Sequence, residues 1–153
     1  MKKLCAILLL AAMLLTLTAC GGKETKAVNV NLTDVMAKFS LGEEMMTLTA
    51  DDLRDMYGID AADVKQFAAA INSTGIKCDE IILIEAASSD AAARVKTALD
   101  NRYQAKLNET ENYLPDEYAI IKTCSVTTNG NFVAMIVAAN AADLTKTYTD
   151  SLQ

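Results

Sequence analysis

Apolar residues recur along the chain with two periods, the 3.6-residue period of helices and the two-residue period of strands. Helical spacing predicts short helices after Asn31 and Thr49, a long helix from Ser88 to about Asn108, and a last helix after Asn140. Each of these four starting residues has a side chain that can cap a helix. The apolar stripes of the first, the long and the last helix are Leu32, Val35, Met36 and Phe39; Ala92, Val95, Leu99 and Tyr103; and Leu144, Tyr148 and Leu152.

Two of these helices carry further signals. In the second, Asp52 stands at the capping-box position relative to Thr49, and Gly58 is placed to end the helix in a left-handed conformation. In the long helix, four basic residues fall outside the apolar stripe and are expected on the solvent side. These are Arg94, Lys96, Arg102 and Lys106.

Two segments before the long helix are candidates for strands. Residues 80–86 contain Ile81-Ile82-Leu83-Ile84, a run too apolar on both faces to lie exposed in a sheet. Residues 61–71 are ambiguous, because their apolar positions fit one stripe of a helix and also one face of a strand. Alanine favours helix, so the local pattern leans slightly towards a helix over 61–71.

A hairpin is expected after the long helix. Pro115 prevents that helix from continuing. Strands are then expected over 118–128 and 131–138, around a turn at Asn129-Gly130, a dipeptide typical of tight hairpins. Val126 and Ile136 are expected to be buried in this hairpin.

The N-terminal segment predicts the cellular location of the protein. Met1-Lys2-Lys3 precedes an apolar run from Leu4 to Leu17, which is typical of a secretory signal peptide and shorter than the roughly 20 residues of a membrane span. Leu17-Thr18-Ala19-Cys20 resembles a bacterial lipobox, at which signal peptidase II cuts before a cysteine that becomes lipid-modified. We therefore expect a signal peptide over 1–19, with cleavage between Ala19 and Cys20, a lipidated Cys20 and flexible tether over 20–28, and one domain over 29–153. The alternative is a secreted protein in which Cys20 is a plain thiol.

Composition narrows the function classes. Cleavage after Ala19 would reduce Lys and Arg from 14 to 12 against 20 acidic residues, which leaves a charge near −8. Nucleic-acid binders carry clustered basic residues, so this charge argues against nucleic acid as a partner. It also argues against direct docking on anionic lipid, which leaves the lipid on Cys20 as the anchor. Cys78 and Cys124 could form a disulfide outside the cytoplasm or pack as free thiols.

No motif for catalysis or cofactor binding stands out. The chain has no histidine, the commonest general base and transition-metal ligand. Glu80 and Glu85 lie an odd number of residues apart on one predicted strand, so they are expected on opposite faces. We therefore expect no catalytic residue, no metal site and no cofactor. Tyr113 and Tyr118 flank Pro115 and are candidates for a partner surface, although packing at the edge of the core also explains them.

The order of several short segments resembles the small uncharacterised lipoproteins of Gram-positive anaerobes grouped as domain-of-unknown-function family 4358. The segments are Met56-Tyr57-Gly58-Ile59-Asp60, Asp79-Glu80-Ile81-Ile82-Leu83-Ile84, Asn112-Tyr113-Leu114-Pro115-Asp116-Glu117-Tyr118 and Gly130-Asn131-Phe132-Val133. The resemblance implies a strand over 64–71 instead of a helix. It implies an α+β fold, with a mostly antiparallel sheet of about four strands in a ββαββ core, short N-terminal helices and a C-terminal helix. It implies no established activity.

Together these features predict a lipid-anchored protein on the extracytoplasmic face of the cell membrane. The expected role is a non-catalytic binding or scaffolding module of the cell envelope, with a protein partner there. A small envelope enzyme or an accessory subunit of one is the first alternative. A transporter-associated solute-binding component is a weaker one, because a two-lobed clamshell would need about twice this length.

Overall fold

Five antiparallel strands form one sheet in the computed structural model, which describes residues 29–153. The spatial order is β1-β2-β3-β5-β4, and every neighbouring pair is antiparallel. The strands are β1 (Met45–Thr47), β2 (Val64–Asn72), β3 (Glu80–Ala86), β4 (Ser125–Asn129) and β5 (Phe132–Val137). The α+β class and the ββαββ core are confirmed, and the short edge strand β1 is the fifth strand that the sequence did not predict.

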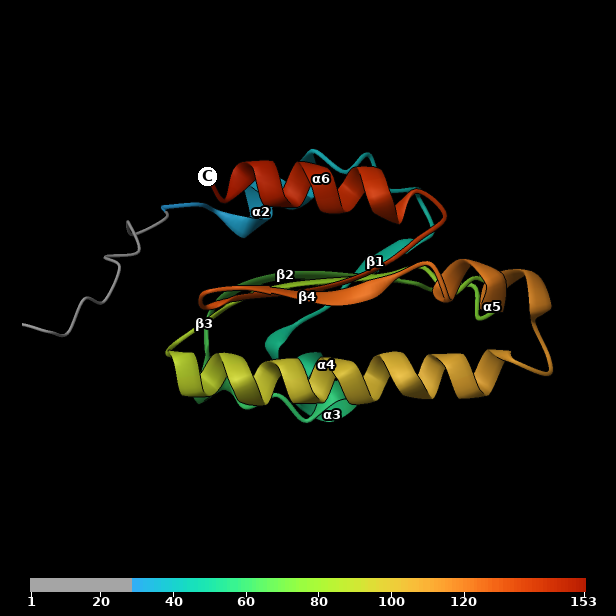
Figure 1. Cartoon of the computed structure of the whole chain (residues 1–153), viewed down its shortest axis with the longest axis horizontal. Helices are drawn as coiled ribbons and strands as arrows, with labels where there is room; N and C mark the ends of the chain where they lie inside the picture. The colour runs from blue at the N-terminus through green and yellow to red at the C-terminus, as the bar shows by residue number, and fades with distance from the viewer. Residues whose placement is uncertain (1–28) are drawn as a thin grey trace, which may run out of the picture.

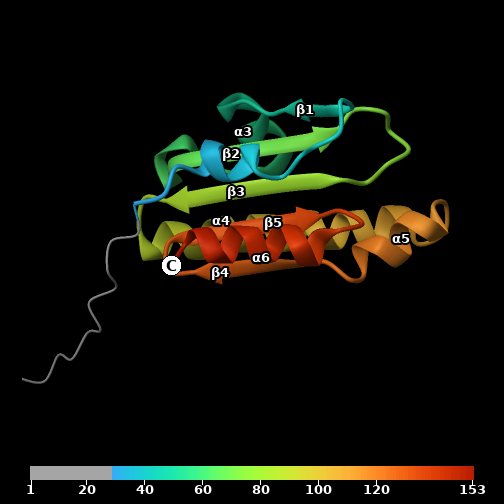
Figure 2. The same ribbon diagram turned by 90° about the horizontal axis from the view of Figure 1, so that it is seen from above.

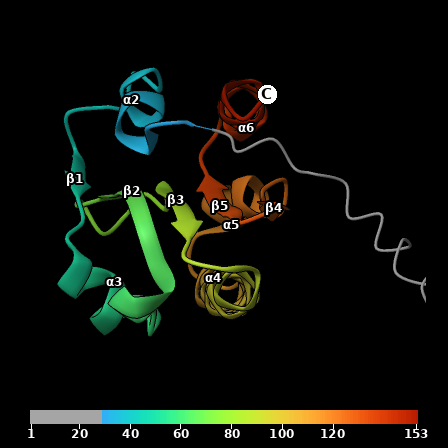
Figure 3. The same ribbon diagram turned by 90° about the vertical axis from the view of Figure 1, so that its left-hand side faces the viewer.

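Helices cover both faces of this sheet (Figures 1 and 3). One face carries α2 (Leu32–Ala37) and α6 (Ala141–Ser151), and the other carries α3 (Ala50–Tyr57) and α4 (Ser89–Thr110). A short helix, α5 (Pro115–Ile121), lies near one end of the sheet (Figure 2). Because both faces are covered, every residue of β3 and β5 is buried. Within residues 29–153 no helix combines the length and apolarity that a membrane crossing requires.

The local signals of α3 are present as expected. The Asp52 carboxylate accepts from the Thr49 backbone N–H at 2.7 Å, and the Thr49 hydroxyl accepts from the Asp52 N–H at 3.2 Å. This reciprocal pair is a complete capping box. Gly58 ends the helix with φ 67°, in the left-handed region.

The ambiguous segment is a strand. A 3₁₀ turn covers Ala61–Asp63, and β2 follows directly from Val64. Residues 68–70 of β2 are buried alanines, which locally favour helix. β2 pairs with β1 on one side and with β3 on the other, so backbone pairing on both sides overrides that preference.

The hairpin is present, with its turn one residue later than predicted. Asn129 pairs with Phe132, so the two turn residues are Gly130 and Asn131. Gly130 has φ 58°, and the only described non-glycine residue with positive φ is Ser40. A positive φ at the first turn position alone is the pattern of a type II′ turn. Ile136 is buried as predicted, whereas Val126 is only half-buried because β4 is an edge strand.

The prediction of a strand over 118–128 is wrong for its first part. Residues Pro115–Ile121 form α5, and β4 begins only at Ser125. Proline suits the first position of a helix, since its missing N–H would have no intrahelical partner there. Asp116 and Glu117 in the first turn add negative charge at the helix N-terminus. Pro115 therefore stops one helix and starts the next.

Candidate functional site

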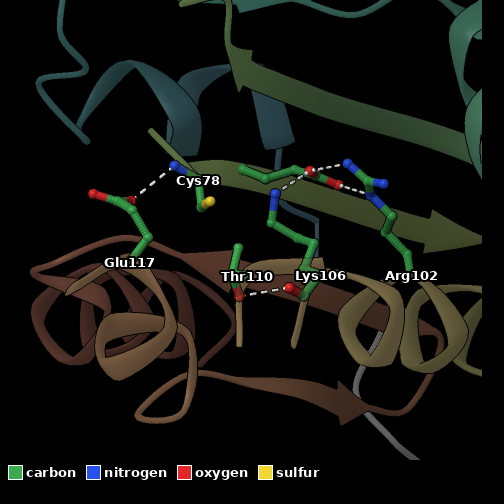
Figure 4. Close-up of polar contacts among 6 residues, drawn as sticks. Cys78, Arg102, Lys106, Thr110 and Glu117 are labelled. Atoms are coloured by element: carbon green, nitrogen blue, oxygen red, sulfur yellow. Dashed lines mark hydrogen bonds and ion pairs between the residues drawn. The ribbon is translucent and has the colours of Figure 1, made fainter. Parts of the chain in front are cut away.

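A buried carboxylate at the start of β3 is held by two cations from α4. Glu80 has no solvent exposure. Its Oε1 accepts from Arg102 Nε at 2.9 Å, and its Oε2 accepts from Arg102 Nη2 and from Lys106 Nζ, both at 2.8 Å. Arg102 and Lys106 are one helical turn apart and both reach from α4 towards the sheet (Figure 4). This is a bidentate arginine–carboxylate pair with a second cation on the same carboxylate.

This cluster corrects the sequence prediction for two residues. Arg102 and Lys106 were expected on the solvent side of the long helix, but Lys106 is buried and Arg102 is half-buried. Two signals in the sequence could have located them. One is Glu80, the acidic residue that opens an otherwise apolar run, and the other is a pair of basic residues spaced i, i+4 on the helix that packs over that strand.

The cluster keeps Glu80 ionised. Burial alone would raise the pKa of Glu80, but the hydrogen bonds and charges of Arg102 and Lys106 outweigh it, so the pKa lies below its ordinary value. The Arg102 guanidinium also lies over the Tyr57 ring, 5.9 Å from its centroid. The Tyr57 hydroxyl is buried near this carboxylate without reaching hydrogen-bond geometry, and burial chiefly raises the pKa of Tyr57 far above its usual range. The phenol therefore stays protonated.

A second carboxylate fixes the segment that leads into β3. Glu117 of α5 is buried, with Oε1 2.8 Å from Lys77 Nζ. Its Oε2 accepts from the Cys78 backbone N–H at 2.9 Å (Figure 4). Burial raises the pKa of Glu117, but the hydrogen bonds from Lys77 and Cys78 outweigh it and the pKa is lowered. Glu80 and Glu117 thus attach two different helices, α4 and α5, to neighbouring points of the chain.

The cysteines of the domain are free thiols. Cys78 is half-buried and Cys124 is buried, and neither forms a disulfide. Burial raises the pKa of Cys78 more than the nearby Lys106 ammonium lowers it. The thiol is therefore protonated near neutral pH, which makes Cys78 a poor nucleophile.

A pocket of about 390 Å³ opens beside Glu117 at this end of the sheet. Its polar lining includes Lys77, Asp79 and Glu117, and its apolar lining includes Phe39 and Ile81. Asp79 is half-buried, and its carboxylate makes no hydrogen bond or ion pair with the residues that the structure describes. Within 29–153, no group of three histidine, cysteine or acidic side chains could hold a metal ion. The buried Glu117 carboxylate in this lining already has its hydrogen-bond partners, Lys77 and the Cys78 backbone N–H.

An apolar groove adjoins this pocket. It has a volume of about 720 Å³ and runs between α2 and the β1–β2 edge of the sheet, with Met36, Leu48 and Phe67 in its lining. Leu41 and Met45 line both the groove and the pocket, so the two are adjacent, and we refer to them together as the concave region. The alanines of β2 form part of its wall.

The contacts of Glu80 and Glu85 place the two carboxylates on opposite faces of β3. Glu80 contacts α4, as described above. Glu85 accepts from Lys65 Nζ and Gln66 Nε2, and Gln66 in turn accepts from the Leu32 N–H at the start of α2. The two carboxylates therefore cannot share one site.

The candidate site residues from the sequence are not brought together. Ala19 and Cys20 lie outside the described residues. Tyr113 lies between α4 and α5 and is 83% exposed. Tyr118 is half-buried on α5, where its hydroxyl donates to Glu111 at 3.4 Å and Lys122 Nζ lies 5.1 Å from its ring centroid.

Comparison with known proteins gives one match. The sequence model of a domain of unknown function, DUF4358, matches residues 37–138. The match contains all five strands, the Glu80 cluster and Glu117. No curated protein and no solved structure matches the chain. Because the match covers about two thirds of its length, the chain belongs to the DUF4358 family.

Proposed function

We propose that this protein is a lipoprotein on the extracytoplasmic face of the cell membrane, anchored by lipid on Cys20, and that its domain is a non-catalytic binding or scaffolding module of the cell envelope. The observation that carries the proposal is Leu17-Thr18-Ala19-Cys20 directly after a short apolar run. One acyl chain gives marginal membrane attachment, whereas the two chains of a diacylglyceryl cysteine give a stable anchor.

The state of the buried carboxylates supports binding over catalysis. A general base needs a pKa near the working pH and access to a proton of the substrate. Glu80 and Glu117 have lowered pKa values, and each already accepts hydrogen bonds from two residues. The concave region formed by the pocket and the groove offers apolar walls with a few polar groups at one end, which is typical of a recognition surface.

Two matched substitutions test the anchor. In the full-length chain we expect Cys20→Ala to abolish incorporation of labelled palmitate and to leave either a soluble mature protein or an uncleaved precursor. Cys5→Ala lies inside the expected signal peptide and should change neither labelling nor membrane fractionation. A Cys20→Ala protein that is still labelled, or that stays on the membrane after the leader has been removed, would contradict the proposal.

Site-specific photocrosslinking in intact cells tests the binding module. A photoreactive residue at Met45, which lines both the pocket and the groove, should give a discrete adduct with an envelope protein. The same residue at Glu109, exposed on α4, is the matched control and should give none. If both positions give the same pattern, the concave region is not the binding surface.

A further inference from the structure

The strand β4 has an unprotected outer edge. It is the last strand of the order β1-β2-β3-β5-β4 and pairs on one side only, with β5 (Figures 2 and 3). Most edge strands are protected from other chains by lysine, proline, a bulge or very short length. The sequence of β4, Ser125-Val126-Thr127-Thr128-Asn129, contains no charge and no proline, and its register with β5 is unbroken.

The hairpin determines which backbone groups of β4 point outward. Asn129 and Phe132 flank a two-residue turn and so form a hydrogen-bonded pair. Hydrogen-bonded and non-hydrogen-bonded pairs alternate along an antiparallel ladder. The N–H and C=O groups of Val126 and Thr128 therefore face away from β5, and no backbone hydrogen bond joins them to another described element.

We propose that β4 pairs with β4 of a second copy, antiparallel about a two-fold axis at Thr127, so that one sheet continues through both copies. In this register Val126 of each copy lies opposite Thr128 of the other, and the outward groups of each pair hydrogen-bond reciprocally. Ser125 lies opposite Asn129 of the other copy. A symmetric interface of this kind needs a self-complementary surface. The outer edge of β4 is one, because Val126 and Thr128 each present an outward N–H and C=O to the other copy.

The Thr127 side chain at the axis favours a second copy as the occupant. The Thr127 hydroxyl is buried and has no hydrogen-bond partner among residues 29–153. At the axis the two Thr127 residues form a non-hydrogen-bonded pair with Cα atoms about 4.5 Å apart, within reach of a threonine–threonine hydrogen bond after a χ1 rotation. After the expected cleavage the net charge is near −8, so two copies repel in general, but the neutral β4 adds no charge at the contact.

The geometry of this dimer is compatible with attachment to one membrane. A two-fold axis between adjacent antiparallel strands is perpendicular to the sheet, so α2 and α6 of both copies lie on the same face. The described chain begins directly before α2. The described residues of both copies would therefore begin on that face. The pairing itself does not depend on the lipid anchor.

Cysteine crosslinking of the full chain tests the register. Under mild oxidation in membranes, Thr127→Cys should form a disulfide-linked dimer, because the expected Cα separation lies within the disulfide range. Ser125→Cys is the matched control, since its symmetry mate would be about 13 Å away along the strands. We expect at least about tenfold more dimer for Thr127→Cys than for Ser125→Cys or for the unsubstituted chain. Equal crosslinking of the two variants, or no dimer with Thr127→Cys, would overturn the proposal.

A second measurement tests the outward hydrogen bonds. Thr128→Pro removes an N–H that points away from β5, so it should prevent copurification of two differently tagged copies while leaving the circular dichroism spectrum unchanged. Persistent copurification by this folded variant would exclude β4 as the interface. If Thr128→Pro does not fold, the crosslinking result decides alone.

Discussion

The Lys106 ammonium lies 2.8 Å from Oε2 of Glu80, and neither side chain is accessible enough to be solvated by bulk water. Arg102 contacts the same carboxylate, so the cluster holds two positive charges against one negative charge. The three charges are therefore not equivalent. Loss of the carboxylate leaves two cations without their partner, whereas loss of the ammonium leaves an intact arginine–carboxylate pair.

The first prediction follows from this asymmetry. Glu80→Gln should reduce the free energy of unfolding by about 3–5 kcal/mol, the usual effect of leaving a buried charge unpaired. Lys106→Met, with a side chain of similar length, should reduce the free energy of unfolding by only about 1 kcal/mol or less. It removes a buried charge and leaves the Arg102–Glu80 pair intact. Denaturant unfolding measures both, and Glu43→Gln, on an exposed residue, serves as the control. Equal losses for the two variants would refute the asymmetry.

The second prediction concerns pH. The pKa of Glu80 is lower in the folded than in the unfolded chain, where the ordinary value is 4.5. Its contribution to stability is therefore fully present above pH 4.5 and is lost as the pH falls through the lower folded pKa. The stability difference between the wild type and Glu80→Gln should be constant from neutral pH to about pH 5.5 and should shrink below pH 4.5. A difference that stays constant down to acid unfolding would contradict the lowered pKa.

The third prediction compares two glycines. Gly58→Ala should destabilise the domain by about 1 kcal/mol, because φ 67° places a side chain in the left-handed region. Gly42→Ala should have little effect or stabilise slightly, because its φ lies outside that region and a Cβ there meets open space. Thermal unfolding of the two variants gives the comparison. A similar shift for both would show that the Gly58 conformation is not required.

The fourth prediction concerns the thiols. Under native conditions near neutral pH, iodoacetamide should alkylate the half-buried Cys78 faster than the buried Cys124, and both more slowly than in the unfolded chain. Digestion and mass spectrometry assign the labelled positions. Cys78→Ala should cost only about 1–2 kcal/mol, because the thiol packs as a small apolar group. Resistance of both cysteines to alkylation in the non-reduced unfolded chain would indicate a disulfide and contradict the free thiols.

Structural features that are determined by residues close together in the sequence were predicted well. The capping box of Thr49 and Asp52, the stop at Gly58 and the strand 80–86 depend on neighbours along the chain or on a strong local run of apolar residues. The hairpin was also predicted, with an error of one residue in the turn, because glycine suits more than one turn type.

Features set by distant contacts were missed. β1 is a strand because Met45–Thr47 pairs with the end of β2, and its own three residues carry no strand pattern. Lys106 is buried because Glu80, 26 residues earlier, provides a carboxylate for it. A helical wheel assigns both basic residues of the cluster to solvent, since periodicity describes hydrophobicity and contains no information on charge pairing across elements.

The alternating strand directions have a consequence for where a ligand of this chain could lie. In open parallel α/β sheets, the carboxyl ends of all strands meet at the same end of the sheet, and ligands bind in the crevice just beyond that end. Here each strand runs opposite to its neighbours, so carboxyl and amino ends of strands alternate at both ends of the sheet. A ligand of this chain would instead have to be held by what lies around the sheet, such as the α2–β1 connection and α5, which both line the pocket.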